Sequence, residues 1–475
     1  MSSEVAPFAQ SGGLADVVAG LPAAQAALGL DAAVIVPMYR GVAERLAAAN
    51  VAIEESIEGS LAIGSYAIPT TLNLCTVGAV RYAFVDCPGL YDRAGTLYGP
   101  GGASEFGDNH LRFALLGMAA TIAGEHLWGA SPDVLHVHDW QGGPAAVYAH
   151  VAGMPSAIVA TIHNLAYRGI FPKAVMTELG IPWSLFNASA LEFYDQVSFL
   201  KGALGLADAV TTVSPTYAKE ILTPERGEVL DGFLKHDVKK LVGIVNGIDT
   251  TLWDPATDPD LPAHFSRDAI AGKAVCRTAL AAEAQLPLTD DEPLIGMIAR
   301  LTGQKGPDLV AEIVPELATL GARLVVLGAG EQALEDRFRW LADTFDAHIS
   351  TTIGFDIGYA RRIYAGSDFF VMPSRFEPCG LGQLYAMRYG SIPIVTSVGG
   401  LRDTVIDPRE GNDRGTGLRF MPPTPVALLA AIARAVALFR DRKRFVALRR
   451  SAMTRDSSWT PSAREYVALY RSLRT

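Results

Sequence analysis

Short apolar runs alternate with amphipathic helical patterns along the whole chain. The clearest runs are residues 32–36, 134–138, 157–162, 209–213, 294–298, 323–327, 369–372 and 392–395. Short runs rich in Val, Ile and Leu are typical of buried strands in a parallel sheet. Strands that alternate with helices form parallel sheets with helices on both faces. The pattern therefore predicts an α/β fold with two such sets of strands, one before and one after residue 245.

Chain length also favours two domains, because 475 residues are too many for one ordinary core. Asn246-Gly247-Ile248-Asp249 is a turn signal, and a loop rich in Pro and Asp follows it at 253–262. We therefore predict an N-terminal domain over 1–243 and a C-terminal domain over 244–455. The last segment, 456–475, has a proline at a predicted helix start and an apolar stripe, which suits a helix closing over either domain.

Composition and charge exclude several classes of protein. The chain is 49% hydrophobic and 19% charged, and its net charge of −10 argues against a general nucleic-acid-binding protein. No apolar run reaches the length of a membrane span, and no signal peptide is visible. The four scattered cysteines fit a reducing compartment and argue against a disulfide framework or a zinc site. We expect a cytoplasmic protein with no membrane or nucleic-acid partner.

The most informative block is residues 374–385, with the sequence S-R-F-E-P-C-G-L-G-Q-L-Y. It follows a predicted strand and leads into a predicted helix that Gly390 ends. A turn with two glycines before a helix start is suited to an anion, because the free N–H groups of the first helical turn point at the ligand. Glu377 would repel phosphate, so we expect it to accept hydrogen bonds from hydroxyls. Phosphate donors beside a hydroxyl acceptor indicate a nucleotide sugar.

A second block supports this interpretation. The segment 292–302 is predicted to form a strand that ends in Arg300, and Gly303-Gln304-Lys305-Gly306 is predicted to form the loop before the helix from Asp308. The planar fork of Arg300 and the mobile charge of Lys305 are suited to a diphosphate. Two solvated cations at a strand end are the alternative, and the Glu377 block favours the binding site.

The N-terminal half has a glycine turn at the entry to its first predicted helix. Gln10-Ser11-Gly12-Gly13-Leu14-Ala15-Asp16 precedes a helix that Gly29 ends. Ser11 is predicted to cap this helix, and the two glycines either admit a phosphate or sugar or form an ordinary turn. A chain of this design should begin with a strand, and residues 1–8 are not strongly strand-like. Either the first strand is abbreviated or the chain begins further upstream.

Two strand ends in this half carry polar side chains. We expect His136 to be a buried histidine with its hydrogen bonds satisfied. Because side chains alternate along a strand, we do not expect His136 and His138 to chelate one metal ion. Asp139, at the carboxyl end of its strand, is the candidate to accept a sugar hydroxyl or to balance an oxocarbenium-like transition state. His163, at the next strand end, binds a substrate or is structural.

These blocks, together with H-V-H-D-W, T-I-H-N-L-A-Y, V-S-P-T-Y, V-N-G-I-D and R-L-T-x-Q-K-G, occur in the order typical of one family. Over essentially its whole length the chain resembles the bacterial glycogen synthases and plant starch synthases. The resemblance implies the GT-B fold: two Rossmann-like domains with parallel sheets that face each other across a cleft holding the active site. It also implies a C-terminal helix that crosses back to the N-terminal domain.

The resemblance further implies retaining transfer of glucose from ADP-glucose to the non-reducing 4-hydroxyl of an α-1,4-glucan such as glycogen. No cofactor or metal is expected, and a homo-oligomer is possible. The catalytic residues it implies are Arg300 and Lys305 on the diphosphate, Glu377 in the sugar-binding loop, and Asp139 and His163 facing the glucose. The donor-binding and sugar-binding positions it implies are Gln10, Gly13, Asp16, Tyr91, Asn246, Gln304, Phe355, Cys379, Gly380 and Leu381.

The sequence departs from the family at two of these blocks. Gln10 stands where a lysine is usual, which removes one charge-assisted contact to the donor. Gly382 stands where threonine is usual. Two alternatives stay open. Gln10 motivates the first, a catalytically weak relative that binds glucan or nucleotide. The second is another GT-B enzyme, such as a UDP-sugar-dependent transferase or a retaining phosphorylase.

Overall fold

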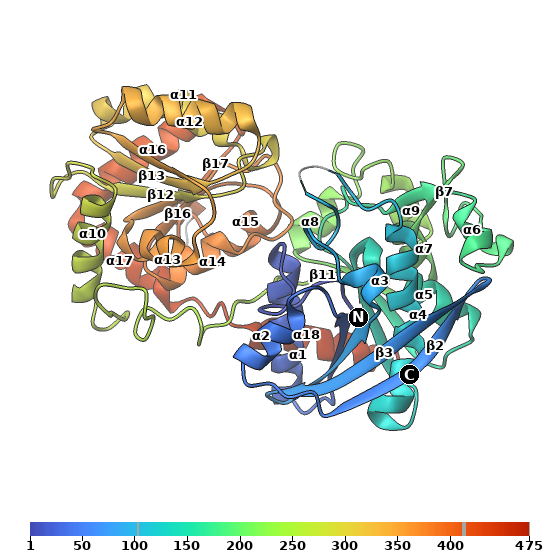
Figure 1. Cartoon of the computed structure of the whole chain (residues 1–475). Coiled ribbons are helices and arrows are strands. Elements are labelled where there is room, and N and C mark those ends of the chain that lie inside the picture. Colours follow the sequence, from blue (N-terminus) through green and yellow to red (C-terminus); the bar gives the residue numbers. More distant parts are fainter. Residues whose placement is uncertain (102–103, 411–414, 475) are drawn as a thin grey trace. The chain divides into compact units, whose positions relative to one another are not determined.

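The computed structural model describes residues 1–101, 104–410 and 415–474. The chain divides into two compact units (Figure 1): unit 1 comprises Met1–Gly247 and Trp459–Thr475, and unit 2 comprises Ile248–Ser458. The predicted boundaries after residues 243 and 455 differ from these by four and three residues. The two points where the chain passes between the units are hydrogen-bonded to each other, because the N–H of Ile248 donates to the carbonyl of Ser457 over 2.8 Å. The chain therefore leaves and re-enters unit 1 at one point.

Unit 1 contains two four-stranded sheets, with strand orders β1-β4-β3-β2 and β11-β10-β6-β5, and a small sheet, β7-β9-β8. The strands are β1 (Ala33–Pro37), β2 (Glu55–Ile63), β3 (Tyr66–Val77), β4 (Val80–Asp86), β5 (Val134–His138), β6 (Ala157–Ile162), β7 (Ile170–Pro172), β8 (Glu192–Phe193), β9 (Gln196–Ser198), β10 (Ala209–Thr212) and β11 (Leu241–Gly243). The second sheet is entirely parallel. In the first sheet β1 and β4 are parallel, whereas β2, β3 and β4 are antiparallel.

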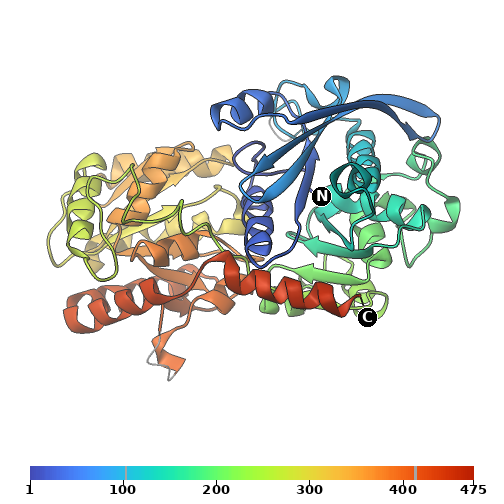
Figure 2. The same ribbon diagram turned by 90° about the horizontal axis from the view of Figure 1, so that it is seen from below.

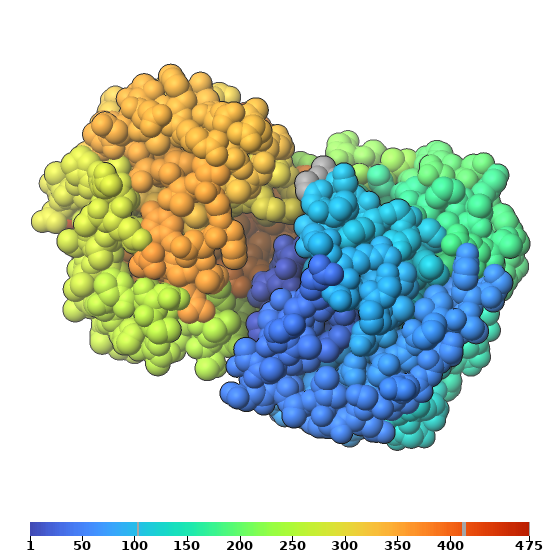
Figure 3. Space-filling view, in the orientation of Figure 1, coloured from blue at the N-terminus to red at the C-terminus, as the bar shows by residue number. Residues whose placement is uncertain are grey.

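The prediction of parallel sheets with helices on both faces is therefore wrong for β2 and β3. Most residues of β2 are exposed, and Figure 3 shows this hairpin at the surface of unit 1. A strand that packs little against a core has no apolar run, so the pattern of buried strands does not reveal it.

The segment before the first helix is not a regular strand. The N–H of Ser2 donates to Ile35 of β1, and the Met1 amino group donates to the carbonyl of His136 of β5. These contacts connect the edge strands of the two four-stranded sheets. The first helix, α1 (Gly13–Ala27), has Gly12 at its N-cap without a side-chain hydrogen bond, so the predicted capping role of Ser11 is wrong.

The last helix, α18 (Trp459–Ser472), belongs to unit 1. It packs against α1 (Figure 2), and Trp459, Tyr466 and Tyr470 share a core with Val17 and Leu21 of α1. The remaining helices of unit 1 are α2 (Val42–Ala48), α3 (Pro88–Tyr91), α4 (Asn109–Trp128), α5 (Asp139–Val151), α6 (Val175–Glu178), α7 (Phe199–Leu206), α8 (Pro215–Glu220), α9 (Asp231–His236) and a 3-10 turn, Trp183–Leu185.

Unit 2 has one six-stranded parallel sheet with the order β14-β13-β12-β15-β16-β17. Its strands are β12 (Leu294–Ile298), β13 (Arg323–Gly328), β14 (Ile349–Ile353), β15 (Phe369–Met372), β16 (Ile392–Thr396) and β17 (Leu418–Phe420). Alternate residues face two cores, so that Phe369 packs in one and Phe370 in the other. This part of the fold matches the prediction of a parallel sheet covered on both faces.

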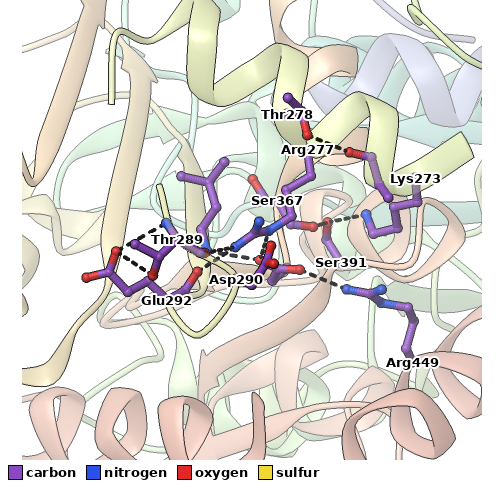
Figure 4. A network of polar contacts seen from close by, with 12 residues as sticks. Lys273, Arg277, Thr278, Thr289, Asp290, Glu292, Ser367, Ser391 and Arg449 are labelled. Carbon is purple, nitrogen blue, oxygen red and sulfur yellow. Dashed lines mark hydrogen bonds and ion pairs between the residues drawn. The ribbon is translucent and has the colours of Figure 1, made fainter. Parts of the chain in front are cut away.

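The helices of unit 2 are α10 (Ala271–Glu283), α11 (Pro307–Leu320), α12 (Gln332–Thr344), α13 (Ile357–Gly366), α14 (Gly382–Arg388), α15 (Gly399–Thr404), α16 (Pro425–Arg440), α17 (Arg442–Thr454) and the 3-10 turns Gly303–Lys305 and Pro408–Glu410. A buried polar network ties two of them to the amino end of β15 (Figure 4). Asp368 accepts from Arg277 of α10 and Arg449 of α17 over 2.9 and 3.0 Å. Lys273 donates to the carbonyls of Ala365 and Tyr389, each over 2.8 Å.

No helix in the described part of the chain combines the length and the apolar character that a membrane crossing requires.

Candidate functional site

The order of strands in unit 2 determines where its candidate site lies. Strands β12 and β15 are neighbours, yet the chain continues from β12 to β13 on one side and from β15 to β16 on the other. In open parallel sheets, ligands bind outside the carboxyl ends of the strands at such a reversal. The loop with Arg300 and Lys305 follows β12, and the loop with Glu377 follows β15. Both predicted loops therefore lie at this reversal.

Lys305 and Glu377 form an ion pair between the two loops. Lys305 Nζ lies 2.6 Å from Glu377 Oε2, and Ser374 Oγ donates to the same oxygen over 3.1 Å. The Glu377 side chain is only 6% exposed, so its charge is balanced inside the protein. Lys305 is thus a paired charge in the structure, whereas the sequence suggests a mobile one.

Arg300 is different, because its side chain is exposed and has no hydrogen bond or ion pair among the described residues. It lies two residues beyond the end of β12. An unpaired guanidinium keeps its full set of donors for an anion, and its planar fork suits phosphate.

A second ion pair joins the same two loops. Arg375 donates to both carboxylate oxygens of Asp308 over 2.8 and 2.6 Å and to the carbonyl of Gly303 over 2.8 Å. The side chain of Gln304 donates to the carbonyl of Phe376 over 3.4 Å. Sequence reasoning missed Arg375 and Asp308 as site-building residues, although Arg375 stands inside the block 374–385 and Asp308 only two residues after Gly306.

The glycine turn after Glu377 is held in place by the side chain of Gln383. Gly380 has φ of +73°, which a side chain would strain. The fully buried side-chain amide of Gln383 donates to the carbonyls of Cys379 and Gly380 over 3.1 and 2.9 Å. The backbone N–H groups of Gly380 and Leu381 have no acceptor among the described residues. With their carbonyls held inward, these N–H groups are suited to an anion, as the sequence predicts.

Two further residues of unit 2 bear on ligand binding. Phe355, in the loop between β14 and α13, is 87% exposed, which leaves its ring faces open for stacking. A Cβ atom added at Gly382 would lie 3.2 Å from the Tyr364 hydroxyl and 3.3 Å from the Phe370 ring. A larger residue at position 382 therefore requires these aromatic side chains to move.

In unit 1 the strand ends bring Asp139 and His163 together. Asp139 Oδ1 accepts from the N–H of His163 over 2.7 Å. Burial, outweighing hydrogen bonds from two backbone N–H groups, raises the pKa of Asp139 to about 7. Asp139 also has φ of +52°, which is uncommon for a residue other than glycine and occurs often at functional sites. Burial lowers the pKa of His163 to about 3, so its ring is neutral.

The histidines on β5 correct one prediction and support another. His136 is bonded at both ring nitrogens, to Tyr470 over 2.7 Å and to Thr161 over 2.5 Å, as expected for a structural histidine. The alternation argument was wrong, because residues i and i+2 share a face, and the rings of His136 and His138 lie 4.3 Å apart. Correct use of this periodicity identifies His138 as a neighbour of the site.

The glycine turn before α1 is already occupied by a carboxylate. Glu4 Oε2 accepts from the N–H groups of Ser11 and Gly12 over 2.8 and 3.0 Å, and Glu4 Oε1 accepts from the Tyr98 hydroxyl over 2.5 Å. These two N–H groups are therefore not open to a phosphate, although Gly13 itself is exposed. Sequence reasoning missed Glu4, because nothing in a single chain shows that residues 4 and 12 meet.

Gln10 and Asp16 lie together beside this turn. Gln10 Nε2 donates to Asp16 Oδ2 over 3.4 Å. Burial and then the charge of Glu4 raise the pKa of Asp16 to about 6. A neutral amide is thus the partner of a carboxylate whose charge is disfavoured.

The last two predicted positions in unit 1 differ in whether their polar groups are already hydrogen-bonded within the protein. Tyr91 is 1% exposed and its hydroxyl donates to the carbonyl of Arg112 over 2.6 Å, so that the group is used inside the unit. Asn246 is 8% exposed, and its Oδ1 is buried without a partner in the described part of the chain. Across the described residues, no group of three or more His, Cys, Asp or Glu side chains is placed to hold a metal ion.

Comparison with known proteins covers the whole chain. The family model for the starch synthase catalytic domain matches residues 1–236, and the model for glycosyl transferases group 1 matches residues 281–450. A glycogen synthase of Anaeromyxobacter dehalogenans (strain 2CP-C) is 46% identical, with 100% of this chain and 98% of that protein covered. A glycogen synthase of Myxococcus xanthus (strain DK1622) is 44% identical with the same coverage.

A solved structure also matches this chain over nearly its whole length. The catalytic domain of Starch Synthase IV from Arabidopsis thaliana, bound to ADP and acarbose, superimposes with a TM-score of 0.88 at 32% identity. The match covers 100% of this chain and 98% of that one.

Replacing Asp139 tests its raised pKa. The folded protein keeps a proton on Asp139 up to about pH 7, whereas the unfolded chain releases it near pH 4. Below about pH 4 the protonation of Asp139 does not lower the free energy of unfolding. As the pH rises from about 4 to about 7, the free energy of unfolding falls by on the order of 4 kcal/mol, because the unfolded chain releases this proton and the folded protein keeps it. Asparagine tolerates a positive φ. We therefore expect the free energy of unfolding of Asp139→Asn, measured by urea titration, to rise relative to that of the parent when the pH is raised from 5 to 8.

Asp108→Asn is the matched control. Burial raises the pKa of Asp108, but hydrogen bonds from Arg93 outweigh burial and leave this pKa below its ordinary value. Its carboxylate is charged at both pH values, so this variant should differ from the parent by the same amount at each. An Asp139→Asn difference that does not change with pH would refute the raised pKa.

Proposed function

The chain belongs to the family of bacterial glycogen synthases and plant starch synthases, and from this premise we propose that it is a retaining glucosyltransferase. In this proposal it transfers glucose from ADP-glucose to the non-reducing 4-hydroxyl of an α-1,4-glucan. The family relationship and the GT-B fold shared with Starch Synthase IV support the reaction class. The ADP in that relative's structure supports ADP as the leaving group.

The observation that carries the proposal is the charge arrangement at the strand reversal of unit 2. Lys305 and Arg300 supply two cations. The N–H groups of Gly380 and Leu381 have no acceptor among the described residues, and Glu377 supplies a carboxylate held by Lys305 and Ser374. A diphosphate needs the cations, and a sugar needs a hydroxyl acceptor next to them. We assign Arg300 and Lys305 to the diphosphate, and Glu377 to the sugar hydroxyls.

Transfer with retention then needs no nucleophile from the enzyme. The bond from the glucose C1 to the phosphate oxygen breaks, and the acceptor O4 bonds to C1 on the same face. The acceptor proton passes to the leaving phosphate oxygen, whose charge Arg300 and Lys305 neutralise. We assign Asp139 and His163 to the transferred glucose. Once Asp139 loses its proton, above about pH 7, its carboxylate stabilises positive charge that develops on the sugar ring.

The remaining positions have secondary roles in this proposal. Phe355 stacks on the adenine, which its exposure allows. Asn246, with its buried free oxygen, and Asp16 accept ligand hydrogen bonds, while Gln304 and Cys379 shape the phosphate and sugar loops. The two cations take the place of a metal ion, so that activity should survive a chelator. We place the enzyme in the cytoplasm, which its four free cysteines suit.

Purified protein should incorporate glucose from ADP-glucose into glycogen without added metal and in the presence of EDTA. The direct measurement follows labelled glucose with ADP-glucose and UDP-glucose in parallel. Incorporation only from UDP-glucose would show that UDP-glucose, and not ADP-glucose, is the donor. No incorporation from either donor, while the folded protein still binds glucan, would favour a catalytically weak relative.

The Gln10–Asp16 contact favours that alternative, because a neutral amide, and no cation among the described residues, is bonded to Asp16. Gln10→Lys should lower the KM for ADP-glucose by about tenfold if a donor contact is missing, since a charge-assisted hydrogen bond contributes about 1.5 kcal/mol or more. Gln10→Met, similar in length but uncharged, is the control. Equal KM values for the parent and Gln10→Lys would mean that the donor does not reach this position.

A further inference from the structure

Two neutral histidines share one proton at the edge of unit 1. His138 ends β5, His163 follows β6, and these strands are parallel neighbours with His138 opposite Thr161. His138 Nδ1 and His163 Nε2 are 2.9 Å apart, and the ring centroids are 5.2 Å apart. Such a distance between ring nitrogens requires one N–H and one lone pair facing each other.

Both rings are uncharged near neutral pH. Burial lowers the pKa of His163 to about 3 and holds the pKa of His138 well below its ordinary value. The pair therefore carries two protons in all, and one of them lies between the rings. The other must sit on the outer nitrogen of the ring that accepts, because that ring uses its inner lone pair.

The outer nitrogens are His138 Nε2 and His163 Nδ1. Neither has a hydrogen-bond partner among the described residues, and neither is among the side-chain atoms sealed from solvent. When His138 donates, His163 Nδ1 carries a proton and His138 Nε2 is bare. When His163 donates, the reverse holds. One outer nitrogen is thus always a donor and the other always an acceptor.

We propose that His138 is a positioning residue that couples its own tautomer to that of His163, so that the pair always presents one donor and one acceptor to sugar hydroxyls. A hydroxyl both donates and accepts, so it matches this arrangement in either tautomeric state. The assignment of the ligand as a sugar rests on the proposed function, whereas the coupling between the rings does not.

The coupling makes a definite spectroscopic prediction for the ligand-free protein. Both rings must carry the same tautomer, either Nδ1–H in both or Nε2–H in both, and imidazole ¹⁵N shifts distinguish these forms. Signals are assigned with His138→Phe and His163→Phe. Opposite tautomers, or an imidazolium in either ring at neutral pH, would overturn the proposal whatever the activity of the protein.

Three variants test the consequence for transfer. His138→Phe keeps a ring of similar size but removes the shared proton, so the His163 signals should change to a tautomer mixture and kcat should fall about tenfold or more. His138→Asn, whose amide can replace Nδ1, should recover both properties in part. His150→Phe, at an exposed histidine of the adjoining helix α5, should change neither.

An unchanged His163 spectrum in His138→Phe would show that the tautomer of His163 is not coupled to His138. A changed spectrum with unchanged kcat and KM would show that the pair does not contact the substrate. If the parent transfers no glucose at all, the spectra still decide the coupling, and only the proposed function fails.

Discussion

Parallel strands place all their carboxyl ends at one edge of a sheet, and the candidate site of unit 2 depends on this constraint. At the reversal between β12 and β15, two loops from different parts of the chain meet. The Lys305–Glu377 and Arg375–Asp308 ion pairs then join them. Lys305 and Glu377 are paired and largely buried, whereas the side chain of Arg300 is exposed. Fold topology thus brings the two loops of the candidate site together, and the ion pairs join them.

Much of this arrangement follows from the sequence. Buried strands of a parallel sheet leave continuous apolar runs, and the runs at 294–298 and 369–372 coincide with β12 and β15. The prediction that the first of these strands ends in Arg300 is wrong by two residues. The loops that follow two adjacent strand ends must then lie together. Strand β2 is different, because most of its residues are exposed and it leaves no comparable run.

The contacts that hold the site are beyond single-sequence reasoning. Arg375 and Asp308 are 67 positions apart, and Glu4 meets the turn at Gly12 only because the chain bends back on itself. Neither residue type nor spacing predicts such pairs. The raised pKa of Asp139 is equally hidden, since it results from burial, which outweighs the hydrogen bonds from two backbone N–H groups. His138 is an intermediate case, which the two-residue periodicity of its strand could have identified.

The most direct test of the account is the affinity for ADP, measured by calorimetry on the parent, Lys305→Met and Glu377→Gln. If Lys305 binds the diphosphate, Lys305→Met should weaken ADP binding by about tenfold or more, since a charge-assisted hydrogen bond is lost. Glu377→Gln should not weaken it, because that change frees Lys305 from its partner 2.6 Å away. Parent-like affinity in Lys305→Met would contradict the assignment of the diphosphate to this loop.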